Sequence, residues 1–139
     1  MRKWLLQVVV LLSIGCADKV ALDDTPQLNG YWEIKQVVFP DGTTKDYTLG
    51  TTVDYIQLTG SNGFRKKVQP KIDGTFDTSN DAERFTITAQ DENIQMNYKT
   101  EWSEWKETLS SLDHNTFSVI NEAGIRYKYQ RFEPIKVDL

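Results

Sequence analysis

The sequence has few of the residues that build disulfides, metal sites and nucleic-acid surfaces. It contains one cysteine, Cys16, and one histidine, His114. A single cysteine cannot form an intrachain disulfide, and one histidine leaves too few soft ligands for a zinc-type metal site. Acidic residues outnumber basic ones by 20 to 16, so no positive field is available to neutralise nucleic-acid phosphates. We therefore expect no metal, no cofactor and no nucleic-acid partner, and a fold that packing alone stabilises.

The one long apolar run lies at the N-terminus. Arg2 and Lys3 precede WLLQVVVLLSIG, and a positive segment followed by a short apolar segment and small residues is typical of a secretory signal. The run is too short for a membrane-spanning helix, which needs about 20 apolar residues. The stretch SIGC resembles the bacterial lipobox, in which the cysteine is diacylated and becomes the mature N-terminus. This resemblance implies that Cys16 is lipidated, although Ser13 stands where the lipobox usually has leucine.

A lipidated Cys16 would attach the following chain to a membrane. Each buried methylene of an acyl chain contributes about 0.8 kcal/mol, and stable anchoring takes more than one chain. The alternatives are cleavage near Ala17 and a free, buried cysteine. Lipidation after export implies a place in the cell envelope. In enterobacterial lipoproteins an aspartate after the cysteine resembles an inner-membrane retention signal, and Ala17 at this position favours the outer membrane.

The chain divides into three expected segments: a lipoprotein signal at 1–15, a flexible tether at 16–27 and a folded domain at 28–139. The tether is polar and contains Asp18, Asp23, Asp24 and Pro26, a composition that does not bury a core. From Leu28 onward, short apolar alternations are separated by turn residues. This pattern indicates an antiparallel meander.

The alternating runs predict about nine strands and no helix. The runs are GYWEIKQVVF, TVDYIQL, GFRKKVQP, GTF, RFTITA, NIQMNY, SEWKETL, TFSVI and GIRYKYQRF. In the first run, Trp32, Ile34 and Val38 are expected on the buried face. Short connections favour hairpins between neighbours, and a meander protects its edges by closing on itself. We therefore expect an all-β fold in which an up-and-down meander of about eight to ten strands closes into a barrel.

Two residues make a testable case for closure. Trp32 lies at the start of the first strand, and Arg131 lies near the end of the last strand, on the same face as Tyr127 and Tyr129. If an even number of strands closes the barrel, these two ends meet, and the guanidinium can lie over the indole at about 0.5–2 kcal/mol. The alternative is that Arg131 points into solvent at a strand end.

The stretch LNGYWEI, with Gly30 two residues before Trp32, resembles the opening motif of lipocalins. In that family the tryptophan caps one end of the barrel and a late arginine packs across it. The later runs IDGTFDTSNDAERFTI, WKETLSSLDHNTFSV and GIRYKYQRF are similar to lipocalin-like domains of small lipoproteins from Bacteroidetes-type bacteria. The similarity spans Leu28 to Phe132. It implies a small lipocalin-like β-barrel or half-barrel, with closure through Gly30, Trp32 and Arg131, whose interior can hold an apolar ligand.

Aromatic residues dominate the faces expected to point inward. The candidate barrel lining, and hence the candidate ligand-binding set, is Phe85, Tyr98, Trp105, Phe117, Tyr127 and Tyr129; for each of them, plain core is favoured over contact with a ligand. The leading hypothesis is a lipid-anchored envelope protein that binds or sequesters a small apolar molecule. The alternative is a non-enzymatic accessory module that binds another protein of an envelope complex. A filled barrel interior would favour the alternative.

Enzymatic function has little support in the sequence. His114 lies between two expected strands in LDHNTF, which indicates an exposed turn. Glu101, Glu104 and Glu107 could serve acid–base chemistry, but Glu104 and Glu107 fall on opposite strand faces, and all three are expected to be solvated. We therefore expect no catalytic residues, with a hydrolase only as a third possibility.

One basic cluster, GFRKKVQPK, contains Arg65, Lys66, Lys67 and Lys71. On a strand, Arg65 and Lys67 project to one face and Lys66 to the other. One hypothesis is that Arg65 and Lys67 face an anionic membrane surface or an acidic partner. The alternative is a charged edge strand that resists aggregation.

Overall fold

The structure is a computed structural model that describes residues 19–48 and 52–134. One short 3-10 helix, η1 (Leu22–Leu28), precedes ten strands. The strands are β1 (Gly30–Val38), β2 (Thr44–Asp46), β3 (Val53–Thr59), β4 (Asn62–Pro70), β5 (Phe76–Thr78), β6 (Glu83–Gln90), β7 (Asn93–Lys99), β8 (Glu104–Leu112), β9 (Thr116–Asn121) and β10 (Arg126–Arg131). Within these ranges no helix is long and apolar enough to cross a membrane. Cys16 and the expected signal lie outside the described residues.

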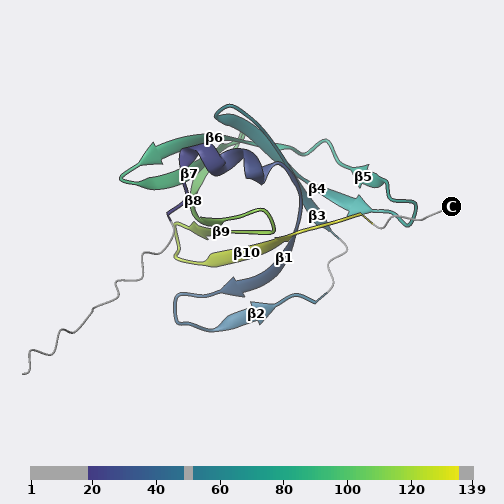
Figure 1. The fold of residues 1–139 in the computed structure, drawn as a ribbon, viewed down its shortest axis with the longest axis horizontal. Coiled ribbons are helices and arrows are strands. Elements are labelled where there is room, and N and C mark those ends of the chain that lie inside the picture. The colour runs from purple at the N-terminus through teal and green to yellow at the C-terminus, as the bar shows by residue number, and fades with distance from the viewer. Residues whose placement is uncertain (1–18, 49–51, 135–139) are drawn as a thin grey trace, which may run out of the picture.

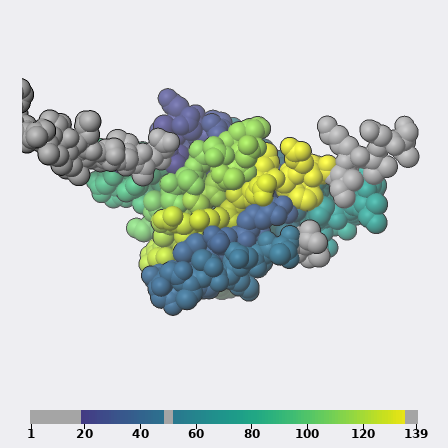
Figure 2. All heavy atoms as spheres, turned by 60° about the horizontal axis from the view of Figure 1, so that its bottom comes forward, coloured from purple at the N-terminus to yellow at the C-terminus, as the bar shows by residue number. Residues whose placement is uncertain are grey.

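Eight of the strands form a closed antiparallel barrel (Figure 1). Around the barrel they follow the chain in the order β1, β3, β4, β6, β7, β8, β9 and β10, and β10 pairs with β1. The two remaining strands extend hairpins, β2 from β1 and β5 from β4. Figure 2 shows the closed wall from outside, with β10 between β9 and β1. The expected all-β meander, its closure and its strand number are confirmed.

β2 is the strand that the sequence did not predict. Its residues Thr44–Asp46 are all exposed, so no apolar alternation marks them. It forms because the turn after Phe39 returns the chain along β1, where Lys45 pairs with Val37. Pairing of exposed residues is set by turn geometry and backbone hydrogen bonds, which a hydrophobic pattern does not report.

A β-bulge in β1 corrects the expected buried face of this strand. The pairing with β10 shifts between Ile34 and Gln36, so the side-chain alternation slips by one residue. Trp32 stays buried, but after the bulge it is Val37, only 4% exposed, that points inward in place of Val38. The prediction for Val38 was therefore wrong.

The apolar core fills one end and the middle of the barrel. Its members come from η1 and from the inward faces of every barrel strand except β4: Leu28, Trp32, Ile56, Leu58, Phe85, Ile87, Ile94, Met96, Tyr98, Leu109, Phe117, Val119 and Tyr129. Trp32 packs edge-on against Phe117, with ring centroids 4.7 Å apart. The Phe117 ring in turn stacks on Tyr129 at 4.6 Å. These stacked rings fill the interior of the barrel next to Trp32.

The helix η1 closes the filled end of the barrel. It packs against β3 and β8, and both Leu28 and Thr25 are buried. The Trp32 indole N–H donates a 2.8 Å hydrogen bond to the Leu28 carbonyl. Residues 22–27, expected as part of a flexible tether, are thus folded onto the barrel. The folded part of the chain begins earlier than the sequence suggested, because Thr25 is buried despite the polar composition around it and its hydroxyl donates a 2.8 Å hydrogen bond to the Leu22 carbonyl.

Candidate functional site

The barrel is open at the end opposite η1. The residues there come from the starts of β3, β6, β8 and β10, from the loop before β6, from the middle of β4 and from the end of β9, which the antiparallel register brings to the same end. They surround a cavity of about 270 Å³. The lining residues are Asp54, Arg65, Lys66, Lys67, Asp81, Glu83, Trp105, Glu107, Asn121, Tyr127 and Tyr129. We call this cavity the mouth.

Arg65 forms the floor of the mouth. It lies on the inward face of β4 and is only 8% exposed. Its guanidinium lies over the Tyr129 ring, 4.8 Å from the centroid. Its Nη2 donates to Asp54 Oδ2 at 2.6 Å, and its Nη1 donates weakly to the Tyr98 hydroxyl at 3.5 Å. Burial would lower the pKa of Arg65, but Tyr129, Tyr98, Asp54 and Glu107 together raise it well above its usual value.

Asp54 holds two cations on one wall of the mouth. Besides Arg65, its carboxylate accepts a 2.7 Å hydrogen bond from Lys67 Nζ. The side chain of Asp54 is 6% exposed and that of Lys67 is 71% exposed, so the lysine reaches in from the rim. Burial would raise the pKa of Asp54, but the charges and hydrogen bonds of Arg65 and Lys67 outweigh it and lower that pKa. Asp54 is therefore ionised and fully engaged.

Glu107 lies on the facing wall and is not engaged in the same way. Its side chain is 12% exposed, and its Oε1 lies 4.0 Å from Arg65 Nη1. Among the described residues no hydrogen bond reaches its carboxylate, and Arg65 is its only cation within 4.0 Å. Burial raises the pKa of Glu107, Arg65 offsets part of this effect, and Glu83 and Asp54 add to it. The sequence expectation that Glu107 is solvated was therefore wrong.

Aromatic rings complete the walls of the mouth. Trp105 stacks on Tyr98 with centroids 5.1 Å apart and planes 2° apart. Both Trp105 and Tyr127 are half-buried and pack against the apolar core. Burial raises the pKa of Tyr98 and of Tyr129, with Arg65 opposing the effect in both. Both phenols therefore stay neutral and act as hydrogen-bonding groups.

The six candidate lining residues divide between core and mouth. Phe85 and Phe117 are 3% and 1% exposed and do not reach the cavity. Tyr98 is buried beneath Trp105 and reaches the site only through its hydroxyl group. Trp105, Tyr127 and Tyr129 line the mouth directly. The structure thus brings half of the candidates to one cavity and assigns the others to packing.

The expected closure pair meets at the filled end. Trp32 is the register partner of Arg131, and the guanidinium carbon lies 4.2 Å from the indole centroid. Arg131 also donates hydrogen bonds to the carbonyls of His114, Asn29 and Gln27 at 2.6, 2.9 and 2.8 Å. It thereby ties β10, η1 and the β8–β9 turn together, in contrast to the alternative of a solvent-exposed side chain.

Gly30 is required by the position of Arg131. Its φ is +127°, and a Cβ at this position would lie 2.5 Å from Arg131 Nη1. Both the backbone conformation and the space therefore exclude a larger residue. The glycine of the motif thus leaves room for the arginine to cross the end of the barrel, where its guanidinium lies over the indole of the tryptophan.

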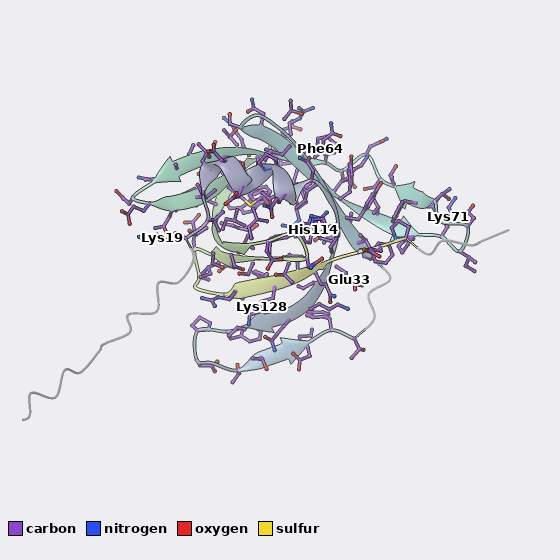
Figure 3. The ribbon with its side chains drawn as sticks, in the orientation of Figure 1. Lys19, Glu33, Phe64, Lys71, His114 and Lys128 are labelled. Atoms are coloured by element: carbon purple, nitrogen blue, oxygen red, sulfur yellow. The ribbon has the colours of Figure 1, made fainter. Side chains whose placement is uncertain are left out.

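The structure also places the residues of the basic cluster and the single histidine. Arg65 is buried inside the barrel, so it does not face a membrane or an acidic partner, and β4 is a central strand with neighbours on both sides. Lys71 is exposed in the β4–β5 hairpin, away from the barrel (Figure 3). His114 is exposed in the β8–β9 turn (Figure 3). In the part of the chain that the structure describes, no cluster of acids, histidine or cysteine could hold a metal.

The sequence interpretation missed the charged residues of the mouth. A signal was present in the spacing. Asp54 lies two residues from Ile56 and four from Leu58, and Glu107 lies two residues from both Trp105 and Leu109. Strict alternation places each acid on the inward face of its strand.

Comparisons with known proteins found distant likenesses in structure only. No protein-family model and no curated protein matches the chain. A lipocalin-like protein from Bacteroides uniformis is 13% identical over 76% of this chain and 99% of its own, with a TM-score of 0.48. A protein from Bacteroides eggerthii is 11% identical with the same coverage and TM-score. Lobster apocrustacyanin A1 is 13% identical over 86% of this chain and 74% of its own, with a TM-score of 0.45. The description of the barrel rests on its own strand order and closure.

Proposed function

We propose that this protein is a non-enzymatic binding protein that holds a small molecule in the mouth of its barrel. The observation that carries the proposal is that the barrel is filled at the η1 end and has an open, lined cavity, the mouth, at the opposite end. A cavity of about 270 Å³ is near the lower limit of ordinary ligand pockets, about 300–1,000 Å³. The ligand is accordingly compact.

The lining argues for an amphipathic ligand and against a purely apolar one. Seven of the eleven lining residues are charged, and Arg65 forms the floor. Burying a wholly apolar molecule there would strip water from charged groups without replacing their hydrogen bonds, which is costly. A ligand with one flat apolar part and one polar group can meet both the aromatic and the charged walls.

The proposal includes attachment to the cell envelope. Lipidation at Cys16 would place the barrel a few residues from a membrane, because η1 begins at Leu22 and is folded onto the barrel. The short connection, residues 17–21, leaves the barrel close to the lipid surface. We propose the outer membrane as its location, on the basis of Ala17.

The alternative, a module that binds another envelope protein, has less support. Ile72 and Trp102 are 87% and 88% exposed, and they lie in two different hairpins. Single exposed apolar side chains are ordinary on protein surfaces, whereas interaction sites usually show a contiguous patch. The half-filled interior also differs from the fully packed centre that this alternative predicts.

The direct test is native mass spectrometry of the full-length protein extracted from its host in mild detergent. We expect an added small mass that is released when the protein is unfolded. Trp105→Ala removes an aromatic wall of the mouth and should lose the added mass. Trp102→Ala, an exposed tryptophan in the same hairpin, is the matched control and should retain it. Absence of any added mass, or equal retention by both variants, would overturn the proposal.

A further inference from the structure

The inference begins with the state of Glu107 in the mouth. Its side chain is only 12% exposed, its nearest cation is 4.0 Å away and no described residue donates a hydrogen bond to it, so the little solvent that its carboxylate oxygens still contact is their main polar partner. A buried carboxylate without close partners is costly to maintain. Because Glu107 lines the cavity, its free lone pairs are available to whatever occupies that cavity.

The cations of the mouth do not compensate this charge. Arg65 and Lys67 are both bound to Asp54, at 2.6 and 2.7 Å. Glu83 and Asp81 also line the cavity, and neither has an ion pair among the described residues. The lining contains four carboxylates against three basic groups. Arg65 and Lys67 are bound to Asp54, which leaves Lys66 as the one lining base without an ion pair among the described residues, against the three carboxylates of Asp81, Glu83 and Glu107. An arriving positive group therefore finds more open partners than an arriving anion does.

The barrel already shows how it holds a cation. The Arg65 guanidinium lies on the Tyr129 ring and against the Asp54 carboxylate. Trp105 and Tyr127 line the same cavity as Glu107 and offer the same two elements, a ring and a carboxylate. Aromatic faces attract cations most strongly where water is excluded.

We propose that the ligand of the mouth is an organic cation, a protonated amine on a compact apolar body, with its ammonium on Glu107 and its apolar part against Trp105 and Tyr127. This inference rests on the proposed function and specifies its ligand class. The raised pKa of Glu107 is consistent with it, because burial and the neighbouring acids disfavour the bare carboxylate, and a bound cation relieves that cost.

The test is isothermal titration calorimetry on the full-length chain in lipid nanodiscs at pH 7, with empty nanodiscs as the blank. Three probes share a phenyl body and differ in charge: 2-phenylethylamine, 2-phenylethanol and 3-phenylpropanoate. We expect the amine to bind tightest and the carboxylate weakest. Glu107→Gln should weaken amine binding about tenfold to a hundredfold, the range for a hydrogen bond to a charged group. The control Glu104→Gln, on the outward face of the same strand, should leave it unchanged.

The outcomes separate the ligand class from the function. If the alcohol or the carboxylate binds as tightly as the amine, or if Glu107→Gln leaves the amine affinity unchanged, the cation inference is overturned while binding in the mouth stands. If none of the three probes binds, both are overturned. The ranking of the probes on the unaltered chain decides the question even if Glu107→Gln were to unfold.

Discussion

Asp54→Asn is the substitution that most directly probes the charges inside the barrel. The change keeps the size of the side chain and removes its charge. Arg65 is 8% exposed and would lose the negative charge that now lies 2.6 Å away, although the amide oxygen of Asn can still accept a hydrogen bond. The next carboxylate, that of Glu107, lies 4.0 Å away, beyond hydrogen-bond distance. The substitution therefore leaves a buried guanidinium without a carboxylate in hydrogen-bond contact.

The expected cost follows from this burial. Removing one partner of a buried ion pair costs about 3–5 kcal/mol, because the remaining charge stays desolvated. The loss of the Lys67 contact adds little, since that lysine is mostly exposed and surface pairs contribute about 0–1 kcal/mol. Arg65→Met should also destabilise the barrel. The double variant should cost less than the sum of the two, with a coupling energy of about 2 kcal/mol or more.

The assay is urea unfolding of the three variants and the parent chain at pH 7 and pH 3. The pKa of Asp54 is lowered in the folded protein, because Arg65 and Lys67 outweigh the opposing effect of burial. Its contribution to stability is therefore present above the ordinary carboxyl pKa and is lost as the pH falls through the lowered one. The cost of Asp54→Asn should accordingly shrink at pH 3. A cost below about 1 kcal/mol at pH 7, or strictly additive costs, would refute the reasoning.

Three further changes have defined outcomes. Arg131→Ala removes three hydrogen bonds and the contact with Trp32 and should lower the free energy of unfolding by about 2 kcal/mol or more; thermal unfolding checks this, and an effect no larger than that of Lys128→Ala on the outer face would contradict it. Glu107→Gln should stabilise the empty barrel by about 1 kcal/mol at pH 8 and less at pH 4, because a raised carboxyl pKa means that stability is lost as pH rises through it; urea unfolding at both values decides. Cys16→Ser should abolish incorporation of labelled palmitate, and persistent labelling would place the acyl group elsewhere.

The barrel could be predicted because its apolar signal repeats along the chain. Ile56 and Leu58, or Phe85 and Ile87, alternate with exposed residues, and a half-buried strand imposes that period directly. Closure followed from one pair of chain ends, with Trp32 meeting Arg131. These features depend on local alternation and on the need to protect sheet edges.

The mouth could not be predicted in the same way. Placing Asp54, Arg65 or Glu107 inside requires knowing that a partner on another strand lies opposite, because an isolated buried charge is prohibitive. That partner depends on strand register and on where the apolar core ends. Alternation put each residue on the inward face, but the cost of burial argued for solvent until the register of β3 and β4 brought Asp54 and Arg65 together. The bulge that buries Val37 in place of Val38 could not be predicted either, because nothing in the spacing of the apolar residues indicates it.

The central claim is that the mouth of the barrel holds a small molecule and the other end does not. The measurement that tests it most directly compares amide ¹H–¹⁵N spectra of the chain extracted from its host with those of the same chain after unfolding, dialysis and refolding. The account predicts shifts confined to strands around Trp105, Glu107 and Tyr127, with unchanged signals around Trp32 and Arg131, and recovery when the dialysed small molecules are returned. Identical spectra, or differences centred on the Trp32 end, would contradict it.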